Sequence, residues 1–181
     1  MPWITKPVPF NISQGAAVSA AVEQEWIPNL SGSAGEDGLA TTNSAYDTWK
    51  SQITTGNPMI GYTLISIKVL WKCQTATPAA GTWQIKHFDS GGSQKGTTTS
   101  TTATPPSTSG SFSNETFDAS NATSTIAVND YFTLKCLETD DGNRSIVLRT
   151  YPTCTGDCQY SNTVLATGYS INPVESTWTF S

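Results

Sequence analysis

The chain has 181 residues and a net charge of −5, and only 13% of its residues are charged. That is about half the charged share of a typical soluble protein, so hydroxyl and amide side chains must solvate the surface, as in extracellular and virion-exterior β proteins. The nine basic residues lie singly along the chain. This argues against a nucleic-acid partner, because binding to phosphates needs a basic stripe.

Residues 1–13 contain three prolines placed between large apolar residues. Proline favours an extended backbone, so we expect an extended N-terminal arm. The arm either packs on its own domain or reaches onto a neighbouring subunit, and its candidate interface residues are Trp3, Ile4, Val8 and Phe10. It lacks the apolar region of a secretory signal, and no apolar run in the chain approaches the roughly 20 residues of a membrane span. Residues 14–181 are expected to form a single domain.

The region before residue 60 has mixed signals. Residues 14–26 are rich in alanine and fit either a helix or a first strand. Residues 28–42 are rich in Gly, Ser and Asn, which predicts a loop. A Ser-x-x-Asp sequence followed by aromatic and apolar residues at helical spacing predicts one short helix over residues 44–53.

Residues 64–89 carry the clearest pattern in the chain. A period of two predicts a strand with one buried face. Pro78 and Gly81 interrupt the run, and Trp83 begins a second strand. The residues on the first strand's buried parity are Ile65, Ile67, Val69, Trp71 and Cys73.

Residues 90–120 are about half Ser and Thr, which predicts a long, mobile, exposed excursion with one or two edge strands around Phe112 and Phe117. Alternation returns afterwards. The expected elements are a turn at Asn129-Asp130, a hairpin turn at residues 140–143, and strands over 131–137, 145–151, 163–171 and 176–180. The sequence therefore predicts an all-β protein, an antiparallel β-sandwich of jelly-roll type with about eight strands and at most one or two short helices.

Side chains suited to catalysis are few. The one histidine, His87, lies within a strand on the parity of Trp83 and Ile85, and we interpret it as a core or sheet-face residue. The chain has no G-x-S-x-G elbow and no phosphate-binding glycine loop. We therefore expect no catalytic residues, no cofactor and no enzymatic activity.

Two acidic clusters, Glu36-Asp37 and residues 138–143, fall in glycine-containing sequences typical of turns, where aspartate is favoured for backbone reasons. The second offers oxygen ligands to calcium but lacks the alternating frame of a dedicated site. A zinc site would need cysteines far apart in the sequence to meet. No metal site is expected.

The four cysteines permit three pairings. The favoured pairing joins Cys154 to Cys158 across a small loop and Cys73 to Cys136 across the core. The alternative for Cys73 and Cys136 is that both are small buried hydrophobes.

The tryptophans fall into two groups. One group, on the core parity of strands, is structural: Trp71, Trp83 and Trp178. The other group lies outside the clear strands and consists of Trp3, Trp26 and Trp49. An exposed ring there would stack on a sugar or a protein partner, but a core position is favoured for each of the three.

Two stretches, TPAAGTW at residues 77–83 and VNDYFTLKC at residues 128–136, resemble jelly-roll modules of tailed-phage virion proteins, a group often compared with the C1q/TNF fold. The similarity covers about half of the chain, and its motifs are structural turns. Residues 1–60 and the loop between Cys154 and Cys158 depart from the pattern.

This resemblance implies a protein of the virion exterior, usually trimeric and not enzymatic. The leading hypothesis is a capsid decoration or cement protein, whose arm and sheet edges bind the major capsid protein or other virion proteins. The alternative is a tail-fibre or other receptor-binding tip, or a carbohydrate-binding module with a glycan as its ligand.

Overall fold

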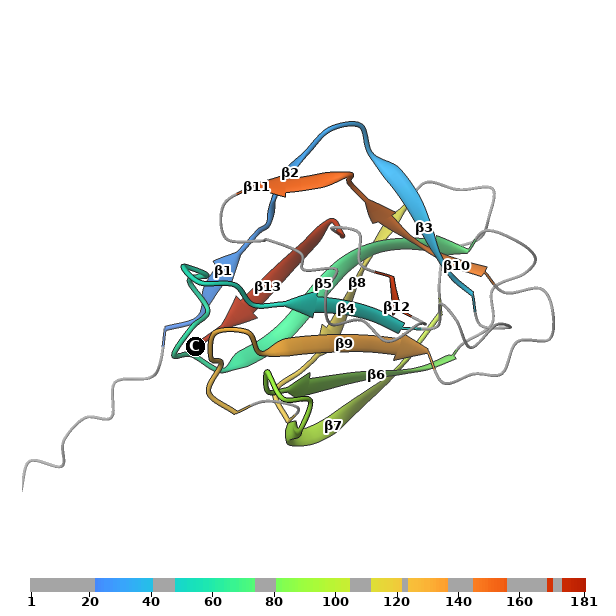
Figure 1. Cartoon of the computed structure of the whole chain (residues 1–181). Helices are drawn as coiled ribbons and strands as arrows, with labels where there is room; N and C mark the ends of the chain where they lie inside the picture. The colour runs from blue at the N-terminus through green and yellow to red at the C-terminus, as the bar shows by residue number, and fades with distance from the viewer. Residues whose placement is uncertain are drawn as a thin grey trace, which may run out of the picture.

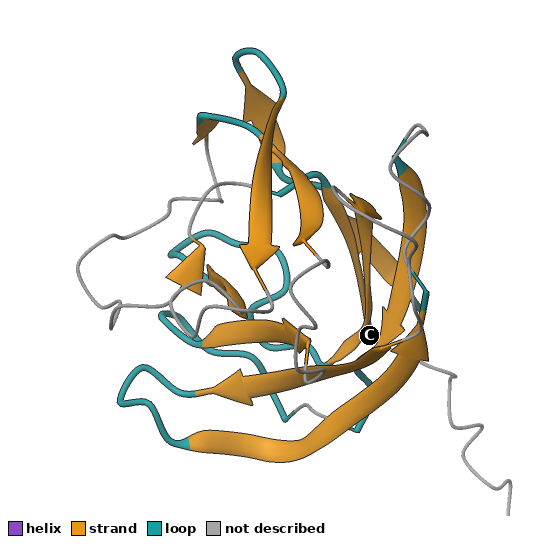
Figure 2. Ribbon diagram, turned by 90° about the vertical axis from the view of Figure 1, so that its right-hand side faces the viewer, coloured by secondary structure: helices purple, strands orange, loops and turns teal. Residues whose placement is uncertain are grey.

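The computed structural model describes residues 22–40, 48–73, 81–104, 112–121, 124–136, 145–155, 169–170 and 174–181. Throughout these ranges the regular elements are strands, thirteen in number, and none is a helix (Figure 2). The predicted all-β sandwich is confirmed, with more strands than the eight expected. Its jelly-roll type stays a prediction.

The strands form two main sheets and a small ribbon (Figure 1). In the six-stranded sheet, the longest strand, β5, pairs along one edge with β13 and β10 and along the other with β8. This sheet consists of β1 (Gln24–Trp26), β13 (Ser176–Phe180), β5 (Leu64–Cys73), β10 (Ser145–Thr150), β3 (Gly35–Ala40) and β8 (Ser113–Asp118).

The five-stranded sheet lies opposite, and its strand order is β12-β4-β9-β6-β7. The ribbon pairs β2 (Asn29–Ser31) with β11 (Thr153–Thr155). All pairings are antiparallel except that of β12 with β4. The strands of the five-stranded sheet are β12 (Tyr169–Ser170), β4 (Thr48–Gln52), β9 (Tyr131–Cys136), β6 (Gly81–Phe88) and β7 (Gln94–Ala103).

Six of the antiparallel pairs are nested along the chain. The innermost pair is the hairpin β6–β7, and successive pairs enclose it: β5–β8, β4–β9, β3–β10, β2–β11 and β1–β13. A long hairpin of this kind, folded over on itself, distributes its pairs between two facing sheets. Strands distant in sequence therefore become neighbours.

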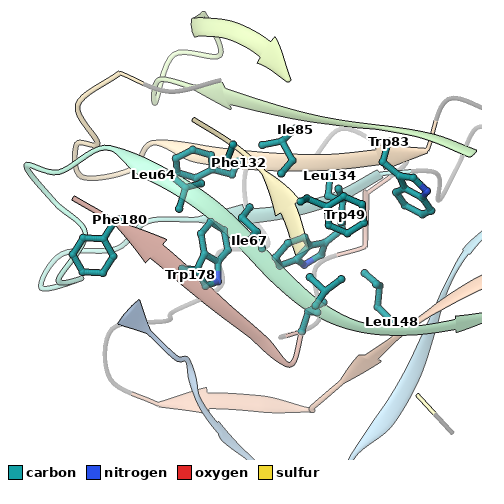
Figure 3. Packing of buried hydrophobic residues seen from close by; sticks show 14 of the residues in the cluster. Trp49, Leu64, Ile67, Trp83, Ile85, Phe132, Leu134, Leu148, Trp178 and Phe180 are labelled. Atoms are coloured by element: carbon teal, nitrogen blue, oxygen red, sulfur yellow. The ribbon is translucent and has the colours of Figure 1, made fainter. Parts of the chain in front are cut away.

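Aromatic rings join the two sheets through the middle of the molecule (Figure 3). Trp71 of β5 meets Trp83 of β6 edge-on, with ring centroids 5.1 Å apart. Trp178 of β13 contacts Trp49 of β4 at 5.8 Å and Phe132 of β9 at 5.6 Å. All five side chains are buried. The predicted core positions of Trp71, Trp83 and Trp178 are confirmed.

The alternation predicted for residues 64–73 holds except at its start. Ile67, Val69 and Trp71 are buried, but Leu64 rather than Ile65 faces the core at the first position. The register with β13 shifts between Thr179 and Phe180, so a bulge reverses the parity there.

Two expectations for the first third of the chain were wrong within the described residues. Thr48–Gln52, placed in a helix, forms β4. Trp49, Ser51 and Ile53 share one parity of this stretch and are buried, while Lys50, on the other parity, is also buried, at 8%. A period of two therefore prevails over the helical spacing of the large residues, and Trp49 has the core position favoured for it. Residues 28–42, expected to be a loop, contain β2 and β3, while residues 24–26 form the strand alternative, β1.

The prediction for the Ser/Thr-rich residues 90–120 was also wrong in part. Their first half forms β7, a ten-residue strand, instead of an irregular excursion, although half of the residues of this strand are exposed as expected. A strand at Phe117 is confirmed as β8, and Phe117 itself is buried in the core. The predicted hairpin turn at 140–143 lies outside the described residues.

Candidate functional site

A tight turn before β9 places one carboxylate inside the sandwich. The amide of Asp130 donates to the carbonyl of Ala127, and Asn129 adopts a left-handed φ of 68°. The backbone of Ile53 clamps this turn, since its amide donates to the Asp130 carbonyl and its carbonyl accepts from Asn129, both at 2.8 Å. The predicted turn at Asn129-Asp130 is confirmed, and it points Asp130 inward, where the residue is 2% exposed.

His87 faces this carboxylate from β6. It is fully buried, and its ring stacks on Phe132 of the neighbouring strand β9 with centroids 4.4 Å apart. The interpretation of His87 as a core residue is confirmed. A polar ring is stable at this buried position because it forms a hydrogen bond with Asp130.

The His87 cluster consists of His87, Lys95 and Asp130. Asp130 Oδ2 lies 2.8 Å from His87 Nε2 and 2.6 Å from Lys95 Nζ. The same oxygen accepts the backbone amide of Ala127 at 2.9 Å, and Lys95 Nζ also donates to the Thr125 carbonyl at 2.7 Å. One carboxylate oxygen thus ties together β6, β7 and the turn that leads into β9.

The carboxylate fixes the tautomer of the histidine. A carboxylate only accepts hydrogen bonds, so His87 Nε2 carries the proton and Nδ1 holds the lone pair. Nδ1 is buried and has no hydrogen-bond partner within the described ranges. Desolvation lowers the pKa of His87 below its ordinary value, and this effect exceeds the opposing attraction of Asp130.

The carboxylate itself stays charged. Burial raises the pKa of Asp130, but the hydrogen bonds from Lys95, Ala127 and His87 together outweigh burial and bring the pKa below its usual value. In its ground state, therefore, the cluster contains an ion pair between Lys95 and Asp130 beside a neutral imidazole.

A bulge in β7 brings Lys95 to the cluster. Ile85 pairs with Thr99 and His87 pairs with Lys95. Between these two pairs β7 therefore contains two more residues than β6. Gly96 in the bulge has a φ of 68°, which favours glycine. Thr97 anchors the bulge, since its amide and hydroxyl both donate to the Asn121 carbonyl, at 3.1 and 2.6 Å.

A second candidate site is the edge of the six-stranded sheet at β1. Within the described part of the chain, β1 pairs only with β13, so its other edge is open. Val22 and Ile27, on either side of this strand, are the most exposed large apolar residues that the structure describes, at 76% and 62%. Glu23 and Glu25 are exposed between them and give the edge an acidic character. We call residues 22–27 the β1 edge.

A third feature is a pair of aromatic rings on the outer face of the five-stranded sheet. Phe88 and Tyr131 are cross-strand neighbours whose rings stack at 4.9 Å. Lys50 Nζ lies 3.7 Å from the centroid of the Tyr131 ring, and its burial there lowers its pKa. Gln94 and Gln52 flank the pair in the same cross-strand row.

Few of the residues singled out from the sequence can be placed at these sites. The interface candidates Trp3, Ile4, Val8 and Phe10 lie outside the described residues, as does Cys158. Cys73 is buried at the end of β5. Cys136 and Cys154 lie in β9 and β11, and the structure describes only the backbone at these two positions. Both proposed disulfides therefore stay predictions.

No protein-family model matches this sequence, and no curated protein matches it either. Among the described residues, no helix is long and apolar enough to cross a membrane, and no group of His, Cys, Asp and Glu side chains is arranged to hold a metal ion.

Proposed function

We propose that this chain is a non-enzymatic structural protein of a virion exterior, and more specifically a capsid decoration protein. Its partners are the major capsid protein or other virion proteins, and it acts as a homotrimer. The nested strand pairing supports a jelly-roll module, because the pairs β1–β13, β4–β9, β5–β8 and β6–β7 divide between two facing sheets as a jelly roll requires.

The observation that carries the proposal is the β1 edge. An exposed sheet edge can pair with a strand of another chain, and natural proteins usually prevent this with lysine, proline or a bulge at the edge. Here Val22 and Ile27 instead place apolar side chains in solvent at the two ends of an open edge. Such an edge fits an extended segment of another protein chain.

The charge of the β1 edge restricts which partner strands can pair with it. Glu23 and Glu25 would oppose each other if two copies of this edge paired in antiparallel fashion, because like charges directly opposite destabilise a strand pair. A partner strand with basic side chains avoids this repulsion. The apolar residues of the N-terminal arm precede β1 in the chain, and the proposal assigns them to the same contact.

The mechanism is interfacial. Strand addition at the β1 edge and apolar contacts of the arm bury surface that belongs to adjacent capsid subunits. Each Å² of buried apolar area contributes about 25 cal/mol of binding free energy. Many copies of this contact over a capsid shell would together resist expansion of the shell.

The test is binding to heads assembled from the capsid proteins of the same virus. Purified full-length chain should associate with expanded heads and raise their melting temperature. The double variant Val22→Asp/Ile27→Asp, and separately a chain without residues 1–13, should bind at least tenfold more weakly. Val128→Asp is the matched control, because Val128 is also exposed, at 39%, but lies outside the β1 edge. Equal binding by all variants would contradict the proposal.

A glycan-binding function is the second candidate, and the ring pair Phe88 and Tyr131 favours it. Half-buried rings flanked by glutamine amides offer apolar contact and hydrogen bonds together, as sugars require. On a glycan array, Phe88→Ala should abolish binding. Phe112→Ala should leave it unchanged, since Phe112 lies near Lys72, a residue of the opposite sheet. An array without signal for the unmodified chain rejects this candidate.

A further inference from the structure

We propose that Lys95 and Asp130 become joined by a covalent side-chain amide bond that forms spontaneously in the folded protein. The bond would connect the Nζ atom of Lys95 on the edge strand β7 with the carboxyl carbon of Asp130 in the turn before β9. The inference concerns the His87 cluster alone and does not depend on the proposed function.

The first support is distance. Lys95 Nζ lies 2.6 Å from Asp130 Oδ2, a distance as short as that of charge-assisted hydrogen bonds, so the two reacting groups are in direct contact. His87 Nε2 and the Ala127 amide hold the same oxygen, and the Thr125 carbonyl holds the amine. Neither reacting group is free to turn away. Well-oriented groups within one molecule react with effective concentrations on the order of 10⁵ to 10⁸ M.

The second support is the dryness around the carboxylate. The side chains of His87 and Asp130 are 0% and 3% exposed, and Phe132 covers the imidazole, while the Lys95 side chain is 24% exposed and reaches in from the surface. The reacting forms are the neutral amine and the neutral carboxylic acid, and burial of Asp130 raises its pKa toward the acid, against the stronger opposing effect of its hydrogen bonds. The ion pair is the ground state here, so the neutral pair is a minor species and the reaction is slow. Exclusion of water also protects the product from hydrolysis.

The reaction balances without any added reagent. The lysine ammonium first passes one proton to the carboxylate, which gives an amine and a carboxylic acid. Nζ then attacks the carboxyl carbon, the bond to one carboxyl oxygen breaks, and that oxygen leaves as water with the second proton from the nitrogen. The one N–H that remains on the amide keeps its acceptor, the Thr125 carbonyl.

The bond would reinforce an open sheet edge. Among the described strands β7 pairs only with β6, so it is the open edge of its sheet. A covalent bond to the turn of β9, the strand on the far side of β6, would close a loop around β6. Unzipping β7 from the edge would then require breaking a covalent bond as well as hydrogen bonds.

The test is the intact mass of the purified full-length chain after reduction of its cysteines. The chain should be lighter than its sequence by one molecule of water. Lys95→Arg is the matched control, because arginine keeps the ion pair with Asp130 but is not a nucleophile at neutral pH. This variant should have the mass of its own sequence and a circular dichroism spectrum like that of the unmodified chain.

Peptide mapping provides a second readout that does not depend on the variant folding. Trypsin should not cleave after Lys95 once its amine is an amide, and a branched peptide containing both Lys95 and Asp130 should appear. A full-length chain whose mass equals its sequence, cleaved normally after Lys95, would overturn the proposal and leave an ordinary ion pair.

Discussion

The middle of the sandwich and the end near the His87 cluster are held together by opposite kinds of contact. In the middle, Trp49, Trp71, Trp83 and Trp178 join the sheets through ring contacts. At the cluster, one carboxylate oxygen joins three segments by directed hydrogen bonds. Aromatic packing responds to volume and hardly to pH, while the cluster responds to single protons and to single atoms. The difference can be measured.

The largest loss of stability is expected from the middle. Trp178→Ala removes a buried ring that contacts Trp26, Trp49 and Phe132. Removal of a large aromatic side chain from a core destabilises a protein by about 3–5 kcal/mol, as denaturant titration would measure. Trp26→Ala, at the only partly buried edge position, should cost clearly less. Equal losses would mean that the ring cluster is not the centre of the core.

Removal of the carboxylate from the cluster should rank second. Asp130→Ala leaves His87, Lys95 and the Ala127 amide without their acceptor, and breaking such a buried arrangement costs about 3 kcal/mol. The control is Asp89→Ala, because the Asp89 carboxylate accepts two backbone amides but lies in an exposed turn. A smaller loss for Asp130→Ala than for this control would contradict the role given to the cluster.

Only the cluster should make stability depend on pH near neutrality. Burial lowers the pKa of His87 in the folded chain, so the unfolded chain binds a proton more readily as the pH falls below about 6.5. The contribution of His87 is therefore fully present above pH 6.5 and is lost as the pH drops toward the lowered folded pKa. Denaturation midpoints between pH 5 and 8 should decline toward acid.

His87→Gln provides the control for this pH dependence. Glutamine does not titrate, so the decline between pH 8 and 5 should become shallower in this variant, whereas Trp178→Ala should keep the full decline at a lower overall stability. An unchanged slope in His87→Gln would assign the pH dependence to other groups.

The smallest effect is expected on the surface. Arg149 and Glu175 form an ion pair at 3.2 Å, but both side chains are more than a third exposed. Solvent screens such pairs, so Arg149→Ala should change the unfolding free energy by about 0.5 kcal/mol or less. A loss comparable to that of Asp130→Ala would show that exposure does not separate these two kinds of ion pair.

Much of the fold could be predicted from the sequence because several strands have one dry face. The strands at residues 64–73, 81–88 and 176–180 all show the alternation. β7 was missed because an edge strand of threonines buries little apolar surface, chiefly Thr99 and Ala103. β4 was missed because its large residues also fit a helical spacing, and only packing between sheets decides between the two periods.

The candidate sites were harder to predict, and the reason is distance along the chain. His87 and Asp130 are 43 residues apart, and Lys95 and Asp130 are 35 apart. Each residue alone has an ordinary explanation, as a core histidine, a turn aspartate and an edge lysine. Their meeting depends on the bulge in β7 and on the left-handed Asn129, and neither leaves a clear mark in a single sequence.

The nested pairing also determines the order in which this molecule can fold. Gln24 pairs with Phe180, so the outermost strand pair joins residues from opposite ends of the chain. Closing loops is entropically cheapest for near neighbours, so assembly should begin at the β6–β7 hairpin and proceed outward pair by pair. β1 stays unpaired until β13 has left the ribosome. Until then a nascent chain carries β1 in a form available to other chains, and only the emergence of β13 lets this pair close.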